Sequence, residues 1–352
     1  MKTQVLIIGG GFAGVATAQK LEKQGIKTTL VDRKDYFEVT YAVLRDVAAP
    51  EMNNGKSRKY YHDILAGTFI QSGVKELQET SAILENGTSI TFDKVVIASG
   101  SRYPSLPLAK SSSAVSLSTR TDELSEQHQK LKAASQVLII GGGVVGVELA
   151  GEIASAMPHI KLTLAHKGNT LLDGFKKKAQ SKALKQLTTA GVSVELNCFY
   201  QEKDNAYIDK NTGKSITPDI VYSATGTIPN NDFLTKNFAH ILNDRGLVVV
   251  NENLAVSKQN NFYAIGDIAD VGEAKLGYLA LEQGKYLAKT IAKQLAGKSN
   301  KAYKRNPFIA LVPTGQKTGV VQLPFMVSTW KALVNIKQKD LFISKTYNEF
   351  AK

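Results

Sequence analysis

Short, continuous apolar runs alternate with segments of helical periodicity along this chain, which is the pattern of a parallel sheet covered by helices. Residues 4–8 predict a buried strand, residues 12–24 the helix that follows it, and residues 27–31 the next strand. The same order returns at Gln136, where an apolar strand leads into a helix that ends near Pro158 and then into a further strand. Two similar strand–helix–strand units predict an α/β protein with an internal duplication.

The intervening segments predict how the units are joined. An Asn-Gly pair at 86–87, inside the alternating stretch 81–98, indicates a hairpin. Residues 101–119 are rich in Ser and Pro, which favours a linker. Later segments predict, in chain order, a helix at 176–190, a strand at 261–271 that ends in Gly-Asp, a helix at 277–295 and a small module at 306–352.

One glycine signature occurs twice, 132 residues apart, and each copy lies between an apolar run and a helical segment. The copies are VLIIGGGFAG, with Gly9, Gly11 and Gly14, and VLIIGGGVVGVE, with Gly141, Gly143 and Gly146. In this context the first glycine makes a tight turn, the second lets the backbone approach a pyrophosphate, and the third lets helix and strand pack closely. The helix N-terminus offers free N–H groups to the anion. Two copies predict two bound dinucleotides and electron transfer between them.

The residue at the end of each second strand bears on nucleotide choice. Asp32 lies 23 residues after Gly9, close to the spacing of a carboxylate that binds a ribose diol, although a solvated strand-end acid is the alternative. The second unit has His166-Lys167 at this point, where a carboxylate would repel a 2′-phosphate. We therefore expect NADPH to be accepted alongside NADH, unless both side chains only point to solvent.

Charge and cysteine content narrow the chemistry. The 352 residues carry a formal net charge of +13, which favours an anionic partner: phosphorylated cofactors, an acidic lipid surface or nucleic acid. The lysines near 178–185 and 331–339 also fit ordinary solvated faces. Cys198 is the one cysteine, so the chain has no cysteine pair to relay electrons, and its five histidines lack metal-ligand spacing. We expect no metal site.

Targeting signals are not apparent in the sequence. The chain begins almost directly with the strand at 4–8 that would hold the first cofactor, so we expect no cleaved signal peptide. Lys2 excludes N-myristoylation, and the sequence has no apolar run of the roughly 18 residues that a membrane-spanning helix needs. The expectation is a cytoplasmic protein, free or attached peripherally to the cytoplasmic face of a membrane.

The order of these motifs resembles the two-dinucleotide-binding-domain flavoprotein reductases of the glutathione-reductase-like fold, over essentially the whole chain. The resemblance implies two Rossmann-like domains and a small C-terminal module: an FAD-binding domain at 1–107 and 235–305, an NAD(P)H-binding domain at 108–234, and a quinone- and membrane-side module at 306–352. It also implies that the helix near Leu276 points its N-terminus at the flavin, whose reduced form the positive end of the helix dipole stabilises.

The resemblance implies two sets of cofactor contacts. The expected contacts to FAD, bound non-covalently in its ordinary or a modified form, are Gly9, Gly11, Phe12, Ala13, Gly14, Asp32, Arg33, Arg45, Val74, Ala98, Gly100, Gly266, Asp267, Tyr278 and Leu279. The expected contacts to NADPH or NADH are Gly141, Gly143, Val144, Val145, Gly146, Glu148, His166, Lys167 and Gly226. Glu148 is expected to face the nicotinamide and the flavin as a catalytic residue, with a favourable acid in the first helical turn as the alternative.

Within this fold, particular stretches resemble the ferroptosis suppressor protein family of apoptosis-inducing-factor-like NAD(P)H:quinone reductases. They include VDRKDYF followed by YAVLR, GGGVVGVELAGEI, YAIGDIADV, KLGYLA and KDLFISKTY. The resemblance implies that Arg45 contacts FAD and that Lys337 is a second catalytic residue at the quinone end; each has a surface cation as its alternative. Type II NADH dehydrogenases are similar, but Tyr278 and Glu282 stand where they carry two glutamines. The acylation signal of the animal ferroptosis suppressors is missing.

The expected activity is hydride transfer from NAD(P)H to flavin, followed by two-electron reduction of ubiquinone, menaquinone or a vitamin K-type quinone. A ferredoxin- or rubredoxin-like protein acceptor is an alternative, as is a nucleic-acid-binding role; no nucleic-acid module is visible, and no specific nucleic acid is expected. Met326, Trp330, Leu333 and Val334 are expected to share a helical face that either meets an anionic membrane or covers the flavin domain. The protein is expected to be a monomer or a homodimer.

Overall fold

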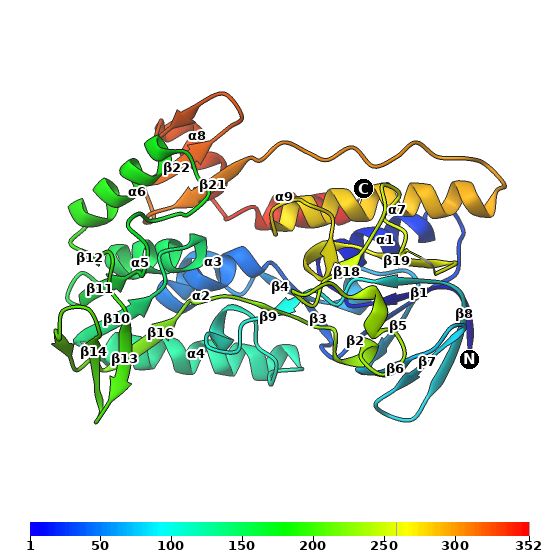
Figure 1. The fold of residues 1–352 in the computed structure, drawn as a ribbon, viewed down its shortest axis with the longest axis horizontal. Helices are drawn as coiled ribbons and strands as arrows, with labels where there is room; N and C mark the ends of the chain where they lie inside the picture. The colour runs from blue at the N-terminus through cyan, green and yellow to red at the C-terminus, as the bar shows by residue number, and fades with distance from the viewer. Residues whose placement is uncertain (258, 352) are drawn as a thin grey trace.

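The computed structural model describes residues 1–257 and 259–351 (Figure 1). Its largest sheet consists of β1 (Lys2–Ile8), β2 (Thr28–Asp32), β5 (Thr68–Gln71), β6 (Val74–Leu77), β7 (Ser81–Leu84), β8 (Ser89–Ile97) and β19 (Phe262–Ala264). The order is β5-β2-β1-β8-β7-β6, and β19 also pairs with β8. Strands β5, β2, β1, β8 and β19 are parallel, whereas β6 and β7 continue as an antiparallel hairpin.

β8 joins the two parts of this first sheet. Its first residues pair with β7 and its last residues, 95–97, pair with β19, so a strand from residue 262 onward completes a sheet begun at residue 2. The central strands are almost inaccessible to solvent, as expected for parallel strands covered on both faces.

Two helices pack against each other over this sheet: α1 (Phe12–Glu22) and α7 (Gly277–Leu295). They cross at Gly284, where a Cβ would lie 2.5 Å from the Ala13 carbonyl oxygen and 3.1 Å from both the Ala16 Cβ and the Thr17 Oγ1. Only glycine fits so close a crossing. The Thr17 hydroxyl, which donates to the Ala13 carbonyl at 2.8 Å, is also buried in this contact.

The second sheet repeats the first on a smaller scale. Its parallel strands are β10 (Gln136–Ile140), β11 (Lys161–Ala165), β12 (Ser193–Glu195) and β16 (Ile220–Ser223), in the order β12-β11-β10-β16. The helices of this unit are α5 (Val144–Ala156) and α6 (Lys177–Thr189). A small antiparallel sheet precedes β16, formed by β13 (Tyr200–Lys203), β14 (Ala206–Asp209) and β15 (Ser215–Ile216).

The two connections between the sheets lie side by side. β9 (Ser101–Arg102) follows the first sheet and pairs antiparallel with β17 (Ile228–Pro229), which follows the second. The Asn230 side chain strengthens this crossing, because it donates to the Ser99 carbonyl oxygen at 2.8 Å. A two-stranded parallel ribbon, β18 (Val248–Val249) with β20 (Ala269–Asp270), follows on the return path.

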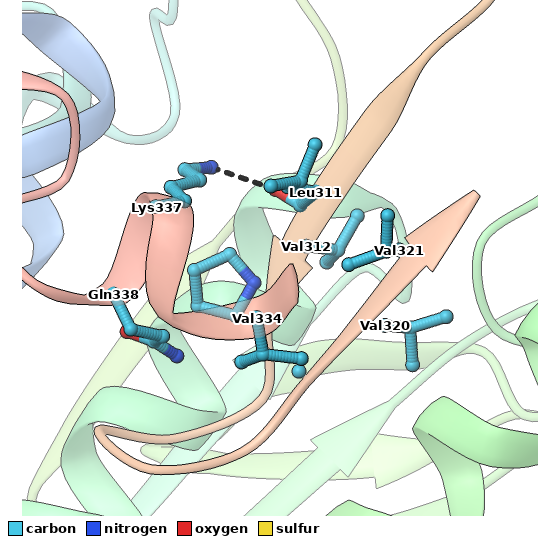
Figure 2. A pocket seen from close by; sticks show the side chains of 9 residues that line it. Leu311, Val312, Val320, Val321, Val334, Lys337 and Gln338 are labelled. Atoms are coloured by element: carbon cyan, nitrogen blue, oxygen red, sulfur yellow. Dashed lines mark hydrogen bonds between the residues drawn. The ribbon is translucent and has the colours of Figure 1, made fainter. Parts of the chain in front are cut away.

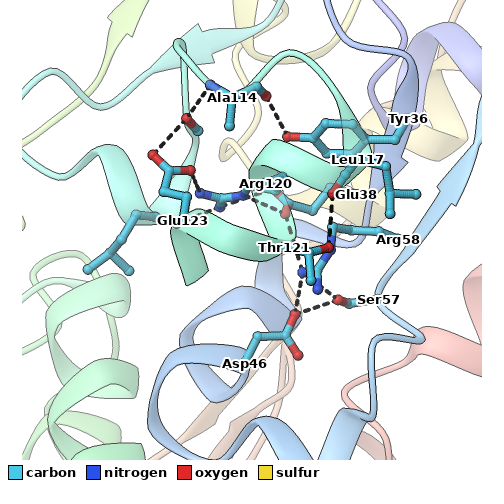
Figure 3. Close-up of polar contacts among 12 residues, drawn as sticks. Tyr36, Glu38, Asp46, Ser57, Arg58, Ala114, Leu117, Arg120, Thr121 and Glu123 are labelled. Atoms are coloured by element: carbon cyan, nitrogen blue, oxygen red, sulfur yellow. Dashed lines mark hydrogen bonds and ion pairs between the residues drawn. The ribbon is translucent and has the colours of Figure 1, made fainter. Parts of the chain in front are cut away.

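A buried network of charges connects helix α4 (Leu117–Ala133) to the strands β3 (Tyr36–Glu38) and β4 (Arg58–Tyr60) and to helix α2 (Val43–Ala48) (Figure 3). Arg120 of α4 donates to the Glu38 carboxylate at 2.9 and 3.3 Å and to Glu123 at 2.6 Å. Arg58, which lies 3.7 Å from Glu38, also donates to Asp46 at 2.8 Å. The residues come from these four elements, and the one-turn helix α3 (Pro50–Asn53) follows α2.

The C-terminal residues form a three-stranded antiparallel sheet and two helices. The strands are β21 (Ala310–Pro313), β22 (Gly319–Gln322) and β23 (Val327–Ser328), followed by α8 (Lys331–Gln338) and α9 (Ile343–Ala351). Val334 of α8 packs on the valines of β21 and β22 (Figure 2). α9 instead packs on the first domain, where Phe350 meets Phe37 with ring centroids 4.9 Å apart. Single 3-10 turns complete the fold: η1 (Thr40–Ala42), η2 (Tyr61–Asp63), η3 (Pro107–Ala109), η4 (Asp232–Leu234), η5 (Ala239–Ile241) and η6 (Gly266–Ile268).

The elements agree with the periodicity at most points and differ at three. The strand expected at 261–271 is wrong in its extent, because β19 ends at Ala264 and Gly266-Asp267 lie in the 3-10 turn η6. The helix expected at 277–295 is α7, and the Asn86-Gly87 hairpin joins β7 to β8. The segment expected to be a linker up to residue 119 is wrong at its end, because α4 begins at Leu117 with a capping box between Ser116 and Thr119. The helical face expected to include Met326 is also wrong: Met326 precedes β23, and Trp330 is the N-cap of α8.

Candidate functional site

The first and third glycines of the two loops have nearly the same surroundings. Gly9 has φ +104°, and a Cβ there would lie 2.3 Å from the Ala98 carbonyl oxygen; Gly141 has φ +120°, with the Ala224 oxygen 2.4 Å away. A Cβ on Gly14 or Gly146 would lie 1.9 Å from the carbonyl oxygen of its own loop's first glycine. Any side chain here would collide with backbone, so the signature is required for the fold itself.

The middle glycines serve a different purpose. Gly11 and Gly143 are the N-caps of α1 and α5, with almost identical backbone angles. Among the described residues, no atom lies within 4 Å of the place where a Cβ of either glycine would be. A glycine cap has no side chain to accept from the first-turn N–H groups, so these donors face open space. Both loops therefore fit the pyrophosphate of a dinucleotide.

The strand-end residues take equivalent positions with different chemistry. Asp32 accepts from the Gly10 N–H at 2.6 Å and from the Lys34 N–H at 2.8 Å. In the second unit, His166 Nδ1 accepts from the Gly142 N–H at 3.1 Å. The histidine thus replaces the carboxylate as the anchor of the glycine loop.

The hydrogen bonds of His166 define its tautomer. Because Nδ1 accepts from an N–H, Nε2 carries the proton, and it lies 3.2 Å from Asp173 Oδ2. The ring is buried, and both nitrogens have partners within the protein. Lys167 is exposed beside it. Of the two residues expected to receive a 2′-phosphate, Lys167 is the one with a free head group in the described part of the chain.

Asp267 lies at the carboxyl end of the first sheet and is held by two donors. Ser101 Oγ donates to its Oδ2 at 2.7 Å and Lys110 Nζ donates to the same atom at 2.8 Å. Burial alone would raise the pKa of Asp267, but the charge and hydrogen bond of Lys110 outweigh it and hold the pKa below its usual range. Asp267 is thus a carboxylate at neutral pH. The preceding Gly266 has φ +76° and donates its N–H to Gln283 at 2.7 Å.

The other residues expected at FAD differ in accessibility. Arg33 is exposed and paired with Glu85, and Tyr278 is half-exposed, with its hydroxyl donating to the Pro307 carbonyl at 2.9 Å. Gly100 and Gly226, which end the two repeats, both have positive φ, at +67° and +126°. The remaining expected contacts are buried or nearly so: Phe12, Ala13, Val74, Ala98 and Leu279 at FAD, and Val144 and Val145 half-buried at NAD(P)H.

The two expected catalytic residues, 189 positions apart, meet in a buried ion pair. Lys337 Nζ of α8 lies 2.7 Å from Glu148 Oε1 of α5. The same ammonium donates to the Leu311 carbonyl oxygen at 3.0 Å (Figure 2). Burial raises the pKa of Glu148 above its usual range, and the charge of Lys337 offsets part of this effect. Lys337 is therefore not a surface cation.

A second buried pair lies one helical turn along α5. Glu152 receives two hydrogen bonds from Arg45 of α2, at 2.8 and 3.0 Å. Arg45 also donates to the carbonyl and side-chain oxygens of Gln338, at 2.8 and 2.5 Å. Arg45 is completely buried, and its donors are directed at Glu152 and Gln338; its expected contact with FAD stays a prediction.

An aromatic contact links this cluster to the first glycine loop. Phe12, the residue after Gly11, stacks on Tyr41 with centroids 5.2 Å apart and an angle of 17°. Lys337 Nζ lies 5.7 Å from the centre of the same Tyr41 ring. Burial raises the pKa of Tyr41 to about 12, so its hydroxyl stays protonated and contacts Thr346 at 2.7 Å.

Sequence reasoning missed several members of this site: Tyr41, Ser101, Lys110, Glu152 and Gln338. Glu152 could have been found, because it follows Glu148 by four residues and therefore shares its helix face. Gln338 follows Lys337 directly. The others carry no local signal, since the contacts that define them span long separations in sequence.

Comparison with known proteins places the chain in a family. The model of the pyridine nucleotide-disulphide oxidoreductase family matches residues 3–284. The chain belongs to this family. Ferroptosis suppressor protein 1 of Xenopus tropicalis is 31% identical over 99% of the chain and 96% of the relative. Apoptosis-inducing factor homolog A of Dictyostelium discoideum is 32% identical over 99% of the chain and 92% of the relative.

Solved structures share the fold at low sequence identity. The sulfide:quinone oxidoreductase of Aquifex aeolicus superposes with a TM-score of 0.78 at 17% identity, over 99% of this chain and 92% of the other. Reduced CoADR-RHD of Bacillus anthracis superposes at 0.75, with 18% identity, 96% of this chain and 63% of the other. The family and the two intact glycine loops identify the chain as an FAD-dependent oxidoreductase that uses NAD(P)H.

Proposed function

We propose that this protein is an NAD(P)H:quinone oxidoreductase. The observation that supports this most is the chain of contacts from the first glycine loop through Phe12 and Tyr41 to the buried Lys337–Glu148 pair. These contacts connect the end of the Gly9 loop to the first turns of α5, the helix that follows the Gly141 loop. Relatives named ferroptosis suppressor protein 1, for which quinone reduction is the activity the resemblance implies, match the chain along almost its full length.

Each loop is assigned to one cofactor in this proposal. The Gly9 loop with Asp32 and Asp267 holds FAD, and the Gly141 loop with Lys167 holds the exchangeable NAD(P)H. The corresponding domains are 1–107 with 235–305, and 108–234. Bound FAD supplies the redox chemistry, by taking two electrons from the nicotinamide and giving them to the quinone. The chain itself positions the rings and tunes the charges around them.

Lys337 and Glu148 act as a unit in this scheme. The ammonium of Lys337 donates a hydrogen bond to the quinone oxygen on which negative charge develops, which is electrostatic stabilisation by a preformed donor. Glu148 keeps the ammonium charged and oriented in a site with little water. Arg45, Glu152 and Gln338 fix the neighbouring turn of both helices, so that the Lys337–Glu148 distance stays constant.

The experiment is stopped-flow reoxidation of the FAD-loaded enzyme after anaerobic reduction by NADPH. A short-chain ubiquinone analogue is expected to restore the flavin absorbance much faster than oxygen does. Lys337→Gln is expected to slow this step by roughly a hundredfold to a thousandfold, the range for loss of one preformed donor, with little change in reduction by NADPH. If quinone reoxidises the flavin no faster than oxygen does, the proposal fails.

We further propose that the C-terminal module contacts an anionic membrane, because a hydrophobic quinone is held there. Phe325 is 98% exposed, Trp330 67% and Ile336 55%, and Lys331 and Lys339 lie beside them. Aromatic and basic residues together favour the interface of a bilayer. None of the helices in the described residues is long and apolar enough to span one. Phe325→Ser/Trp330→Ser is expected to abolish co-sedimentation with phosphatidylglycerol vesicles; unchanged sedimentation would exclude this surface.

A further inference from the structure

A basic groove lies along α7, far from the glycine loops in sequence. The chain leaves the end of α7, turns, and runs back beside it as an extended segment toward β21 (Figure 1). The groove between helix and segment has a volume of about 600 Å³. Five of its lining residues are lysines: Lys285, Lys289 and Lys293 from the helix, and Lys301 and Lys304 from the segment.

The charge of this stretch is one-sided. Residues 283–305 contain six lysines and one arginine and have no Asp or Glu, which gives +7 in 23 residues against +13 for the entire chain. Lys285, Lys289 and Lys293 are spaced by four and therefore lie on one face of α7. Like charges at this spacing repel and destabilise a helix. An anion bound in the groove would reverse that cost.

Most of these ammonium groups are available to a ligand. Lys285 is engaged, at 3.0 Å from Glu282 and 2.8 Å from Glu349, and Lys293 donates to Asn300 at 3.2 Å. The other three, Lys289, Lys301 and Lys304, are exposed and have no side-chain hydrogen bond or ion pair within residues 1–257 and 259–351.

Hydrogen bonds and a ring contact fix the walls of the groove, although three of its five lysine side chains have no partner among the described residues. The Tyr286 hydroxyl donates to the Lys301 carbonyl oxygen at 2.8 Å, and the Tyr303 N–H donates to the Glu252 carbonyl oxygen at 2.7 Å. The rings of Tyr286 and Tyr303 meet edge to face with centroids 5.0 Å apart. The segment is therefore held at a constant distance from α7, which reduces the entropy lost when a ligand binds.

We propose that this groove is a binding site for a molecule with several clustered phosphate groups. Ammonium groups bind phosphate as compact point charges with three donors each. A volume of about 600 Å³ accommodates several phosphates together, and it lies within the usual range of ligand pockets. The site is separate from the glycine loops and goes beyond the proposed quinone reductase function.

The test uses the FAD-loaded enzyme saturated with NADP⁺, so that both glycine loops are occupied, with tripolyphosphate as the probe. Titration calorimetry at physiological salt is expected to give saturable binding that weakens at least tenfold in Lys289→Ala/Lys301→Ala/Lys304→Ala. The matched control, Lys23→Ala/Lys178→Ala/Lys185→Ala, removes the same charge from exposed lysines elsewhere and is expected to bind within about twofold of the wild type. Equal weakening in both variants, or no saturable binding, overturns the proposal.

Two further arms identify the source of the phosphates. Both arms use the Phe325→Ser/Trp330→Ser background, which lacks the proposed membrane contact of the C-terminal module. If the ligand is a lipid headgroup, phosphatidylcholine vesicles that contain a polyphosphoinositide retain this enzyme and tripolyphosphate displaces it; if it is soluble, inositol hexakisphosphate binds and the vesicles do not. Either result supports the site when the groove variant removes it. Tight binding of duplex DNA that is stronger than tripolyphosphate binding and unaffected by the groove variant contradicts it. Flavin reduction by NADPH is unchanged in the groove variant, because its residues lie outside the redox site.

Discussion

The two glycine-loop units have the same backbone and differ in what covers them. In both units, a Cβ on the first glycine would collide with a carbonyl oxygen that follows a parallel strand. A Cβ on the third glycine would collide with the carbonyl oxygen of the first. Helix α1 is then covered by α7 through Gly284, whereas α5 meets β21 at Gly151, where a Cβ would lie 2.2 Å from the Thr314 carbonyl carbon. The glycine loops of the two units therefore have the same geometry, whereas different elements pack on the helices that follow them.

In the proposed function, this difference separates a permanent FAD site from an exchangeable NAD(P)H site. The first loop is anchored by the carboxylate of Asp32 and enclosed by helices from distant parts of the chain. The second is anchored by the neutral tautomer of His166, and α5 carries Glu148 and Glu152 toward the C-terminal module. The same motif is therefore proposed to bind a dinucleotide in both units, and the elements that cover it are expected to decide whether the bound molecule is enclosed or lies near Glu148.

The largest effect is expected from the third glycines. Gly14→Ala and Gly146→Ala each put a methyl group about 1.9 Å from a backbone oxygen, which forces the helix away from its strand. Gly14→Ala is expected to purify without flavin absorbance or not to fold. Gly146→Ala is expected to remain yellow, with flavin reduction by NADPH slowed at least about a hundredfold, or about 2.7 kcal/mol. Absorbance spectra and stopped-flow reduction measure both.

Gly11→Ala and Gly143→Ala are the controls for this pair. A methyl group at either position meets no described atom within 4 Å, so the fold is expected to keep its stability while only the ligand loses its close approach. The two loops do not have separate roles if Gly14→Ala and Gly146→Ala lose binding of the same cofactor. The same conclusion follows if each variant still binds both FAD and NADPH.

The next effect concerns the Lys337–Glu148 ion pair of the second unit. Lys337→Met leaves Glu148 as a buried carboxylate without its cation, which is expected to lower the free energy of unfolding by about 3–5 kcal/mol near neutral pH. The folded-state pKa of Glu148 is already raised by burial and rises further without Lys337. A carboxyl whose pKa is higher in the folded than in the unfolded state stabilises the folded protein at low pH, and this contribution is lost as the pH rises through the folded-state pKa. The loss of stability in Lys337→Met must therefore shrink as the pH falls.

Denaturant unfolding between about pH 5 and about pH 8 measures this dependence. The control is Glu148→Gln/Lys337→Met, which removes both charges and is expected to be more stable than Lys337→Met near neutral pH and to lack the additional pH dependence. A deficit of Lys337→Met that is constant with pH would show that Glu148 takes up no additional proton in the folded variant, which would contradict a further rise of its pKa.

The smallest effect is expected at the strand ends. Lys167→Glu introduces a carboxylate beside the expected 2′-phosphate, and the ratio of kcat/KM for NADPH over NADH is expected to fall about tenfold, or about 1.4 kcal/mol. Lys161→Glu makes the same charge change at the opposite end of β11 and should leave the ratio unaltered. A strong NADH preference in the wild type that Lys167→Glu does not change would assign the selection to other residues.

The sequence predicted the parts of the molecule whose cause is local. The glycine loops follow from backbone collisions within a few residues, and α7 follows from apolar spacing along one helix. α4 was missed because its capping box uses Thr119 rather than the Glu or Gln typical of that position, inside a stretch rich in serine. The helical face around Met326 was wrong because a β-strand pairing with β22 outweighs the helical spacing.

The candidate site was predictable by residue but not by partner. Glu148 and Lys337 were singled out separately, one from its place in a motif and the other from a resemblance, and nothing in their local sequence indicates that they meet. The role expected of Arg45 illustrates the limit. Its side chain reaches Glu152, 107 residues away, and a contact of that kind depends on how two domains and a later helix pack together.

The pairing of β19 with β8 reverses the order in which the two units can mature during synthesis. The second sheet draws its strands from residues 136–223 alone, so it is complete as soon as that stretch has left the ribosome. The first sheet, although made earlier, waits for residues 262–264, and α1 waits longer still for α7. The nascent chain therefore carries an unfinished first sheet with exposed apolar strands while the second unit folds, and this is the interval in which a chaperone or the flavin itself would protect it.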